Sequence, residues 1–429
     1  METYGCQMNE YDSGMIRAML ESSGHTFVPR PEDADVVIVN TCSVRERAER
    51  RVLGRLRHLR GLLGRDAALG VVGCVAQRMG GLLMREVRGL GFVVGTDSYS
   101  VLPEAVERAG EGVATIETET RSDEIYDRRP APSRAGLCEF VSVARGCDNF
   151  CSYCIVPHVR GRERSRPADA VVREVEALSR LGAREVTLLG QNVNSYADGE
   201  TDFARLLERV SRVDAVSRVR FATSHPKDLT ERLVDAVSRL PEVCEHVHLP
   251  VQSGSDRTLR AMNRGYTRRR YLELASLLRK RVPGVALTTD VIVGFPGETE
   301  RDFEDTLSLL EEVRFDSAFM FRYSVREGTA AAALADDVPE PEKIQRLERV
   351  IETQKRITSE LNERLVGEVL EVLLEGPSER NPEKLFGRTR TGKAVVAPAP
   401  RDLSGELVGV RITEASAWTL HGEVVEGAP

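Results

Sequence analysis

The sequence predicts an α/β protein built in three parts, and three observations support this prediction. Short apolar runs alternate with helix-periodic stretches over residues 1–110, and six further strand-and-helix units follow over residues 137–362. The tail, residues 363–429, changes to short β-rich segments separated by glycine-containing turns. Strands that alternate with helices are typical of parallel sheets covered by helices. We therefore expect an N-terminal α/β domain with a parallel sheet, a central partial (β/α)6 barrel and a small antiparallel β-barrel.

The N-terminal domain is predicted from two buried strands and the helices after them. DVVIVNTC (35–42) and LGVVGCVAQ (69–77) are apolar runs of strand length, and residues 43–63 and 77–87 have helical periodicity. Residues 111–136 carry charge and proline with little periodicity. We interpret that segment as a linker.

The central domain is predicted from six strand-like segments: CEFVSVARGC, EVTLLGQN, RVRFATSH, HVHLPVQS, ALTTDVIVGFP and SAFMFRYSVREGT. Two units fewer than in an eightfold barrel leave the barrel open, and chemistry in such folds sits at the carboxyl ends of the strands. The residues expected at those ends are Cys147, Gln191, Asn192, Ser224, His225, Gln252, Ser253, Gly294, Arg326 and Glu327.

The composition limits the classes of function that the protein can have. No apolar stretch is long enough to span a membrane and the start does not resemble a signal peptide, so we expect a cytoplasmic protein. Eight cysteines in a reducing compartment point to metal or redox chemistry rather than disulfides. The net charge of −7 gives no general affinity for nucleic acid.

Positive charge is nevertheless concentrated locally. Arginine is dense in three segments, residues 44–60, 160–167 and 268–281, and each segment taken singly is more often a solvated helix face than a binding surface. In the tail, an RNA-binding role rests on one basic cluster, which consists of Arg380, Lys384, Arg388, Arg390 and Lys393.

Three cysteines follow the first barrel strand with the spacing C-x3-C-x2-C: Cys147, Cys151 and Cys154. Three thiolates hold three corners of a [4Fe–4S] cluster and leave one iron open. In this position the open iron would be chelated by the amino and carboxylate groups of S-adenosylmethionine (SAM), whose reductive cleavage yields a 5′-deoxyadenosyl radical. The alternatives are a zinc knuckle or buried thiols; the barrel context and Tyr153, which precedes the last cysteine, favour the cluster.

A second set of three consists of Cys6, Cys42 and Cys74, which recur 36 and 32 residues apart. Each follows a strand-like run or stands where a strand should end, so parallel strands would bring the thiols to one edge. Taken singly, each could be a small buried hydrophobe; as a trio they indicate a second cluster with an open iron. We expect the remaining two, Cys138 and Cys244, to be core residues.

The order of these motifs resembles, over essentially the whole chain, that of the radical-SAM methylthiotransferases, specifically the tRNA-2-methylthio-N6-dimethylallyladenosine (isopentenyladenosine) synthase, or MiaB, family. The matching segments are TYGCQMNEYDS, NTCSVRERAE, GCVAQ, RGCDNFCSYCIVPHVRGRERSRP, LLGQNVNSY, TSHP, HLPVQSGSD, DVIVGFPGE, FRYSVREGT and, in a TRAM-like barrel, GRTRTGKAVV. Two positions depart from the family: only five residues precede Cys6, which puts the edge of the N-terminal sheet in doubt, and His158 stands where a tyrosine is common, so it receives no catalytic role.

The resemblance implies an enzyme that adds a methylthio group at C2 of isopentenyladenosine-37 in tRNA. One SAM donates a methyl group and another supplies the radical; the first cysteine set binds the SAM cluster and the second an auxiliary [4Fe–4S] cluster. The implied partners are the tRNA anticodon stem-loop and an electron donor such as a flavodoxin or ferredoxin. Polar and glycine positions would line the SAM pocket, although each could instead be a cap or turn: Tyr153, Gly190, Gln191, Asn192, Ser224, Gln252, Ser253 and Gly294.

Other functions remain open at this point. Related methylthiotransferases act on threonylcarbamoyl-adenosine in tRNA or on an aspartate of a ribosomal protein. A non-enzymatic alternative is an RNA-binding protein with structural zinc.

Overall fold

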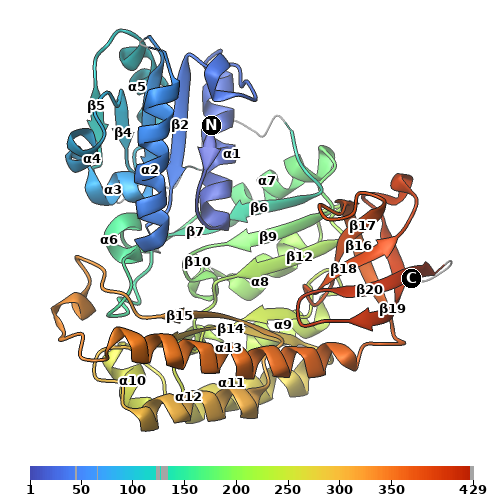
Figure 1. Ribbon diagram of the computed structural model, residues 1–429. Helices are drawn as coiled ribbons and strands as arrows, with labels where there is room; N and C mark the ends of the chain where they lie inside the picture. Colours follow the sequence, from blue (N-terminus) through green and yellow to red (C-terminus); the bar gives the residue numbers. More distant parts are fainter. Residues whose placement is uncertain (44–45, 65, 122–125, 127–133, 426–429) are drawn as a thin grey trace.

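The computed structural model describes residues 1–43, 46–64, 66–121, 126 and 134–425, and it has the three predicted parts (Figure 1). Much of the segment predicted as a linker, two residues of the first arginine-rich segment and the last four residues lie outside the described part. Among the helices of that part, none has both the length and the apolar character that crossing a membrane requires.

The N-terminal domain is a five-stranded parallel sheet between two helical layers. Its strands, in spatial and chain order, are β1 (Glu2–Thr3), β2 (Val36–Thr41), β3 (Ala68–Gly73), β4 (Phe92–Val94) and β5 (Thr115–Glu117). Its helices are α1 (Gln7–Ser22), α2 (Glu46–Leu62), α3 (Cys74–Met79), α4 (Gly81–Glu86) and α5 (Leu102–Gly110). Apolar side chains from α2 and α4 cover one face, and those from α1 and α5 cover the other.

Both edges of this sheet differ from the expectation. The short start of the chain still supplies a strand, because β1 pairs in parallel with β2. At the other edge β5 pairs with β4 inside the segment predicted as a linker. Three residues are too short for a recognisable periodicity, which is why the sequence did not reveal β5.

The central domain contains the six predicted parallel strands in two groups of three. One group is β6 (Cys138–Ser142), β9 (Glu185–Leu189) and β12 (Arg218–Ala222); the other is β13 (His246–His248), β14 (Ala286–Val293) and β15 (Ser317–Arg322). A parallel bridge between Val219 and Val243 continues the curve from one group to the other. The predicted α/β fold with an open barrel is therefore confirmed.

Helices cover the convex side of this curved sheet. They are α7 (Ala168–Arg180), α8 (Phe203–Val210), α9 (Glu231–Arg239), α10 (Asp256–Ala261), α11 (Arg268–Arg281), α12 (Glu300–Val313) and α13 (Glu340–Glu363), while the short α6 (Val156–Arg160) follows the cysteine loop. Two small antiparallel pairs are β7 (Ala144–Arg145) with β8 (Arg164–Ser165) and β10 (Ala197–Asp198) with β11 (Thr201–Asp202). Single 3-10 turns lie at Pro31–Asp33, Tyr99–Val101, Val193–Ser195, Pro226–Asp228, Ala330–Ala333 and Arg401–Leu403.

Strand alternation decides which side chains face the barrel interior. In β12, Val219 and Phe221 join the helix-covered core, so Arg218 and Arg220 point to the opposite, concave face. Cys244 is buried as expected. Cys138 is exposed, which corrects its assignment to the core; it is the first residue of β6, and burial along this strand is complete only at Val141 and Ser142.

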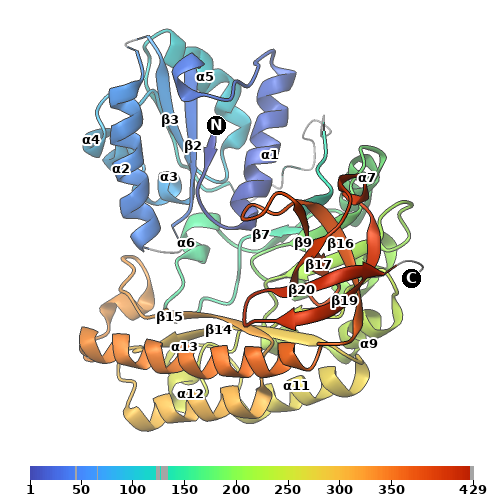
Figure 2. The same ribbon diagram turned by 45° about the vertical axis from the view of Figure 1, so that its right-hand side comes forward.

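The tail is a closed five-stranded barrel formed by β16 (Val369–Pro377), β17 (Lys384–Thr389), β18 (Ala394–Pro398), β19 (Leu407–Ala415) and β20 (Leu420–Val425). Four of its strand pairs are antiparallel as predicted, and the pair that closes it, β18 with β20, is parallel. Figure 2 brings this barrel to the front, against the concave side of the central strands.

Buried charges attach the tail barrel to the central domain. Arg218, fully buried, donates to Glu371 Oε1 at 2.7 Å and to the carbonyl of Arg388 at 2.8 Å. Arg220 donates to the carbonyls of Thr389 and Arg390 at 2.8 and 2.7 Å. The turn between β17 and β18 is therefore held at the amino-terminal end of the central strands.

Candidate active site

The structure brings Cys6, Cys42 and Cys74 to one edge of the N-terminal sheet. Cys6 lies between β1 and α1, Cys42 directly follows β2, and Cys74 is the first residue after β3. Because these strands are parallel neighbours, their carboxyl ends meet, as predicted. The backbones also come close: a side chain at Gly5 would start 2.7 Å from the Cβ of Cys42, so only glycine fits there.

Two buried asparagines fix this edge. Asn9 donates to the side chain of Asn40 at 3.1 Å and to the carbonyl of Thr41 at 3.0 Å. Gly73 is the residue before Cys74, and a Cβ on it would lie 2.5 Å from the Asn40 side-chain oxygen. The network therefore sets the spacing of α1, β2 and β3, and with it the spacing of the three cysteines.

The electrostatic setting of these thiols favours metal-binding thiolate at Cys6. A hydrogen bond with Cys42 lowers the pKa of Cys6 to about 6 against the effect of burial, and the charge of Arg160 acts in the same direction. Burial raises the pKa of Cys74, which Arg160 opposes. A thiolate is the form that ligates metal, and a helix N-terminus such as that of α1 stabilises it.

The second cysteine set forms a compact loop between β7 and α6. The amide of Cys154 donates to the carbonyl of Cys151 at 2.9 Å, and that of Cys147 donates to the carbonyl of Gly161 at 3.2 Å. Arg264 Nη1 donates to the sulfur of Cys151 at 3.3 Å and to the hydroxyl of Tyr153 at 3.4 Å. Burial first, and the neighbouring Cys151 next, raise the pKa of Cys154 to about 12.

A single helix joins the two sets of cysteines. Cys74 packs against Ile155 and Val159, and Ile155 directly follows Cys154 while Val159 is a residue of α6. None of these six described cysteines forms a disulfide bond. Within the described ranges no group of three or more His, Cys, Asp or Glu side chains surrounds one point as a single metal ion would require. A [4Fe–4S] cluster does not require the thiols to surround one point, because each cysteine would bond a different iron. The two sets of three thiols fit such clusters.

The expected SAM pocket is marked by buried polar atoms that have no partner in the described protein. These atoms are Gln191 Oε1, Asn192 Oδ1, Ser224 Oγ and Gln252 Oε1, and all of them follow barrel strands. Buried polar groups normally find partners, so four orphaned ones at one rim fit a polar ligand. Thr223 and Gln252 also adopt left-handed backbone conformations, with φ of 72° and 68°; such strain gathers at binding sites.

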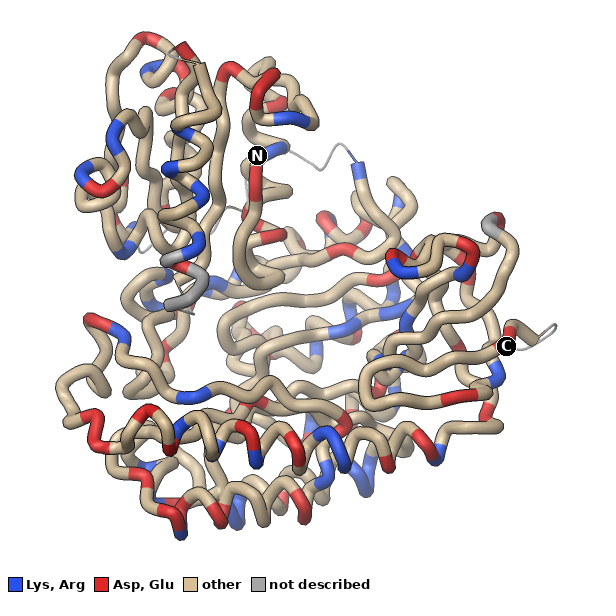
Figure 3. The backbone as a smooth tube through the Cα atoms, viewed as in Figure 1, with Lys and Arg blue, Asp and Glu red and all other residues tan. Residues whose placement is uncertain are grey.

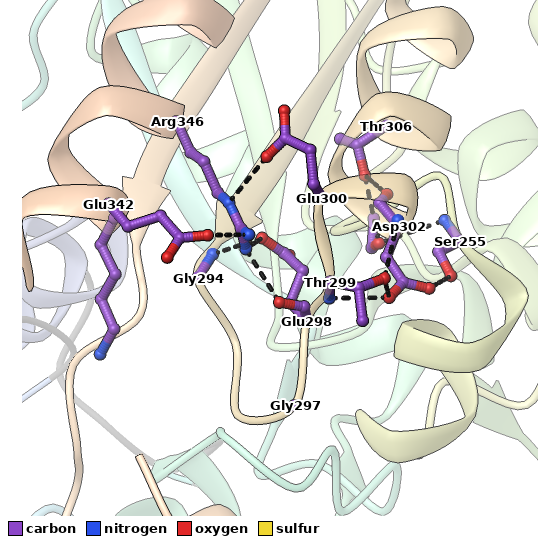
Figure 4. Close-up of polar contacts among 12 residues, drawn as sticks. Ser255, Gly294, Gly297, Glu298, Thr299, Glu300, Asp302, Thr306, Glu342 and Arg346 are labelled. Atoms are coloured by element: carbon purple, nitrogen blue, oxygen red, sulfur yellow. Dashed lines mark hydrogen bonds and ion pairs between the residues drawn. The ribbon is translucent and has the colours of Figure 1, made fainter. Parts of the chain in front are cut away.

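Three other predicted pocket residues are held by the protein itself. Ser253 is fully buried, accepts from the amide of Ser255 at 3.2 Å and bonds Thr306 Oγ1 at 3.3 Å. Gly294 donates to Glu298 Oε1 at 2.8 Å in the turn that Arg346 of α13 secures (Figure 4). A Cβ on Gly294 would lie 2.4 Å from Lys343, so packing already requires this glycine; a Cβ on Gly190 would lie 3.2 Å from Val193.

The basic cluster of the tail barrel does not form one surface. Arg390 bonds both carboxylate oxygens of Glu245 at 2.8 Å, and Lys393 donates to Asp316 at 2.8 Å, so both face the central domain. Arg388 lies over the ring of Phe386 and 3.3 Å from Glu375. Arg380 and Arg388 are exposed, and Lys384 is half-buried at the start of β17.

The arginine-rich segments of the central domain are also largely paired. In α11, Arg268 bonds Glu312 and Arg281 bonds Glu231 and Asp235, and Figure 3 shows acidic and basic residues mixed along α11 to α13. In 160–167, Arg164 pairs with Asp97 and Arg166 with Glu174. Arg162 is exposed and pairs with Asp148 at 3.0 Å, and His158, just before this segment, is exposed.

A buried charge network between the domains escaped the sequence analysis. Asp12 of α1 is fully buried and accepts from Arg145 Nη1 at 2.9 Å and from Arg160 Nη2 at 2.8 Å. Burial would raise the pKa of Asp12, and the two guanidinium groups outweigh it and hold the pKa below its ordinary value. No local pattern could reveal these partners, because 133 and 148 residues separate them.

Comparison with known proteins agrees with this geometry. Residues 141–310 match the Radical SAM superfamily model, residues 1–95 match Uncharacterized protein family UPF0004, and residues 363–425 match the TRAM domain. Among solved structures, a radical S-adenosylmethionine methyltransferase, TsrM, from Kitasatospora setae is similar in fold, with a TM-score of 0.54 and 15% identity over 76% of this chain and 67% of that one.

The barrel and its cysteine loop define a radical SAM enzyme, a class that uses SAM and a [4Fe–4S] cluster. The tRNA-2-methylthio-N(6)-dimethylallyladenosine synthases of Moorella thermoacetica and Syntrophomonas wolfei are 48% and 47% identical to this chain, covering 99% and 98% of it and 98% and 96% of their own lengths. The chain belongs to the tRNA-2-methylthio-N(6)-dimethylallyladenosine synthase family, as its motifs suggested.

Proposed function

We propose that this enzyme attaches a methylthio group to C2 of N6-isopentenyladenosine-37, next to the anticodon of tRNA. The observation that carries the proposal is the arrangement of two three-cysteine sets on either side of α6, one in each domain. Whole-length similarity to synthases named for this product supports it. A radical enzyme that inserts sulfur needs a site for the radical source and a site for the sulfur, and the two sets supply both.

Cys147, Cys151 and Cys154 would hold the SAM cluster, and Cys6, Cys42 and Cys74 an auxiliary cluster. When bound, the first would supply the electron that cleaves SAM, and the second would present the sulfur to be transferred. Gln191, Asn192, Ser224 and Gln252 would then receive the partners that they lack, by bonding the ribose and amino-acid groups of SAM. Gly190 and Tyr153 would shape the pocket, while Ser253 and Gly294 would act through the loops that they hold.

The domains would enclose the target base. The interdomain network around Asp12 is buried between α1 and the barrel, and a closed site would protect a reactive radical. The substrate is tRNA, whose base must leave the anticodon-loop stack; unstacking costs a few kcal/mol and least in a single-stranded loop. Arg380 and Arg388 would contribute phosphate contacts, and a small electron-transfer protein of flavodoxin or ferredoxin type would reduce the SAM cluster.

Nucleoside mass spectrometry tests this function directly. The gene is deleted from its host, and tRNA from the deletion, from the parent and from a strain complemented with C147A is digested and compared. The proposal predicts that 2-methylthio-N6-isopentenyladenosine is lost in the deletion and in the C147A strain, while N6-isopentenyladenosine accumulates. Loss of a methylthiolated threonylcarbamoyl-adenosine instead, or unchanged tRNA, would contradict it.

A further inference from the structure

Arg160 occupies an unusual position between the domains. It is the last residue of α6, only 3% of it is exposed, and it lies six residues after the last cysteine of the SAM-cluster loop. Its Nη2 donates to Asp12 at 2.8 Å, whereas its Nη1 is buried and has no partner among the described residues. A buried donor without a partner destabilises a folded protein, so its retention needs an explanation.

The residues around Arg160 include the auxiliary cysteine set. The preceding residue, Val159, packs against Cys74, so the end of α6 lies against the auxiliary cysteine set. The carbonyl of Val159 accepts from Thr96 Oγ1 at 2.6 Å, which ties the end of α6 to the N-terminal domain. Arg160 is therefore part of the central domain in the sequence, but it lies against the N-terminal domain that carries the auxiliary cysteines.

We propose that Arg160 is a positioning residue of the auxiliary site, where its free Nη1 donates to a sulfur held at Cys6, Cys42 and Cys74 and its charge offsets theirs. This inference rests on the proposed function, since it presumes a cluster at that site. Hydrogen bonds to sulfur and the local charge set the reduction potential of an iron–sulfur cluster. A buried cation with a free donor makes reduction more favourable, and Asp12 fixes its orientation.

Arg145 provides a matched control for the alternative that Arg160 only joins the domains. It is equally buried, at 1% exposed, and it bonds the same carboxylate of Asp12 at 2.9 Å. Its other neighbours are different: its guanidinium lies 4.8 Å from the ring centre of Tyr126, and Nη2 donates to the carbonyl of Thr96 at 3.1 Å. Loss of either arginine breaks the Asp12 network, but of the two it is Arg160 that directly follows Val159, the residue packed against Cys74.

The experiment measures the auxiliary site alone, in full-length protein with Cys147, Cys151 and Cys154 changed to Ala. Into this background R160Q, R160K and R145Q are introduced, and each protein is reconstituted without oxygen. Iron content, the electron paramagnetic resonance spectrum and the midpoint potential are recorded. Thermal unfolding of the reconstituted proteins tests whether R160Q and R145Q disturb the fold to a similar degree.

We expect R160Q to disfavour reduction at least tenfold, which is a shift of about 59 mV to more negative potential for one electron, with an altered spectrum. R160K keeps the charge but cannot serve both Asp12 and a sulfur, so its shift should have the same sign and be smaller. R145Q should stay within about twofold of the background, near 18 mV on the same conversion.

Equal shifts in R160Q and R145Q, or a potential in R160K and R160Q identical to the background, would overturn the role of Arg160. If R160Q fails to take up iron, the potential of R160K decides. A shift to more negative potential supports the role of Arg160, and a potential identical to the background overturns it. A background protein that binds no cluster although Cys6, Cys42 and Cys74 are intact would instead contradict the auxiliary cluster itself, and so the proposed function.

Discussion

Replacing Arg390 with Ala should loosen the attachment of the tail barrel to the central domain. The side chain is 22% exposed, and its Nε and Nη2 bond both oxygens of Glu245 at 2.8 Å. Nη2 also donates to the carbonyls of Pro241 and Val243, each at 2.9 Å. Removing one partner of such a half-buried cluster leaves a carboxylate and two carbonyls without their donor.

The size of the effect follows from these contacts. Hydrogen bonds to charged groups contribute about 1.5–3 kcal/mol each when buried. Because Arg390 is partly exposed, water would make up much of that contribution when the hydrogen bonds are lost. We therefore expect R390A to weaken the docking by about 2 kcal/mol, which is roughly a thirtyfold change in an opening equilibrium. A double-mutant cycle with E245A should give a coupling of about 1 kcal/mol, because the two residues share the interaction.

Hydrogen exchange of the interface measures this opening. Peptides that cover residues 389–393 should exchange roughly thirtyfold faster in R390A, with those of β14 as an internal reference. R380A is the matched control, since Arg380 is exposed in the same barrel. Unchanged exchange in R390A, together with a salt slope of tRNA binding lowered by about 0.7, would refute the anchoring role and return Arg390 to the RNA surface.

Three further predictions concern the site. C147A should abolish formation of 5′-deoxyadenosine, because the cluster loses a ligand; production near the wild-type rate would exclude Cys147 as a ligand. S224A and Q252A should each raise the dissociation constant for SAM by roughly tenfold in anaerobic calorimetry, as each removes about one hydrogen bond, and unchanged affinity would remove that residue from the pocket. G294A should destabilise the protein by about 1–3 kcal/mol in thermal unfolding because of its φ of 68° and its contact with Lys343; a partial rescue by K343A is expected, and a stable G294A would contradict the packing argument.

Much of the fold could be predicted from the sequence because it depends on local patterns. Apolar runs of strand length between helix-periodic stretches gave the six barrel strands, and parallel pairing then placed Cys6, Cys42 and Cys74 at a common edge. β5 has only three residues, which carry too little pattern to distinguish a strand from a linker.

The rest of the site depends on contacts between distant residues. The density of positive charge in the tail indicated RNA contacts, but it could not reveal that Arg390 and Lys393 already bond Glu245 and Asp316. The same reason hid the pairing of Asp12 with Arg145 and Arg160. Charge is visible in a sequence, whereas its partner is set by tertiary structure.

The central claim is that two separate three-cysteine sites exist in two domains. Measuring the iron and acid-labile sulfide content per chain tests this claim most directly. Anaerobically reconstituted wild-type protein should contain about eight irons per chain, and the triple Ala variants at 147, 151 and 154 or at 6, 42 and 74 about four each, since every [4Fe–4S] cluster contributes four. Only the variant that keeps Cys147, Cys151 and Cys154 should cleave SAM. About four irons in the wild type, unchanged when Cys6, Cys42 and Cys74 are replaced, would contradict the account.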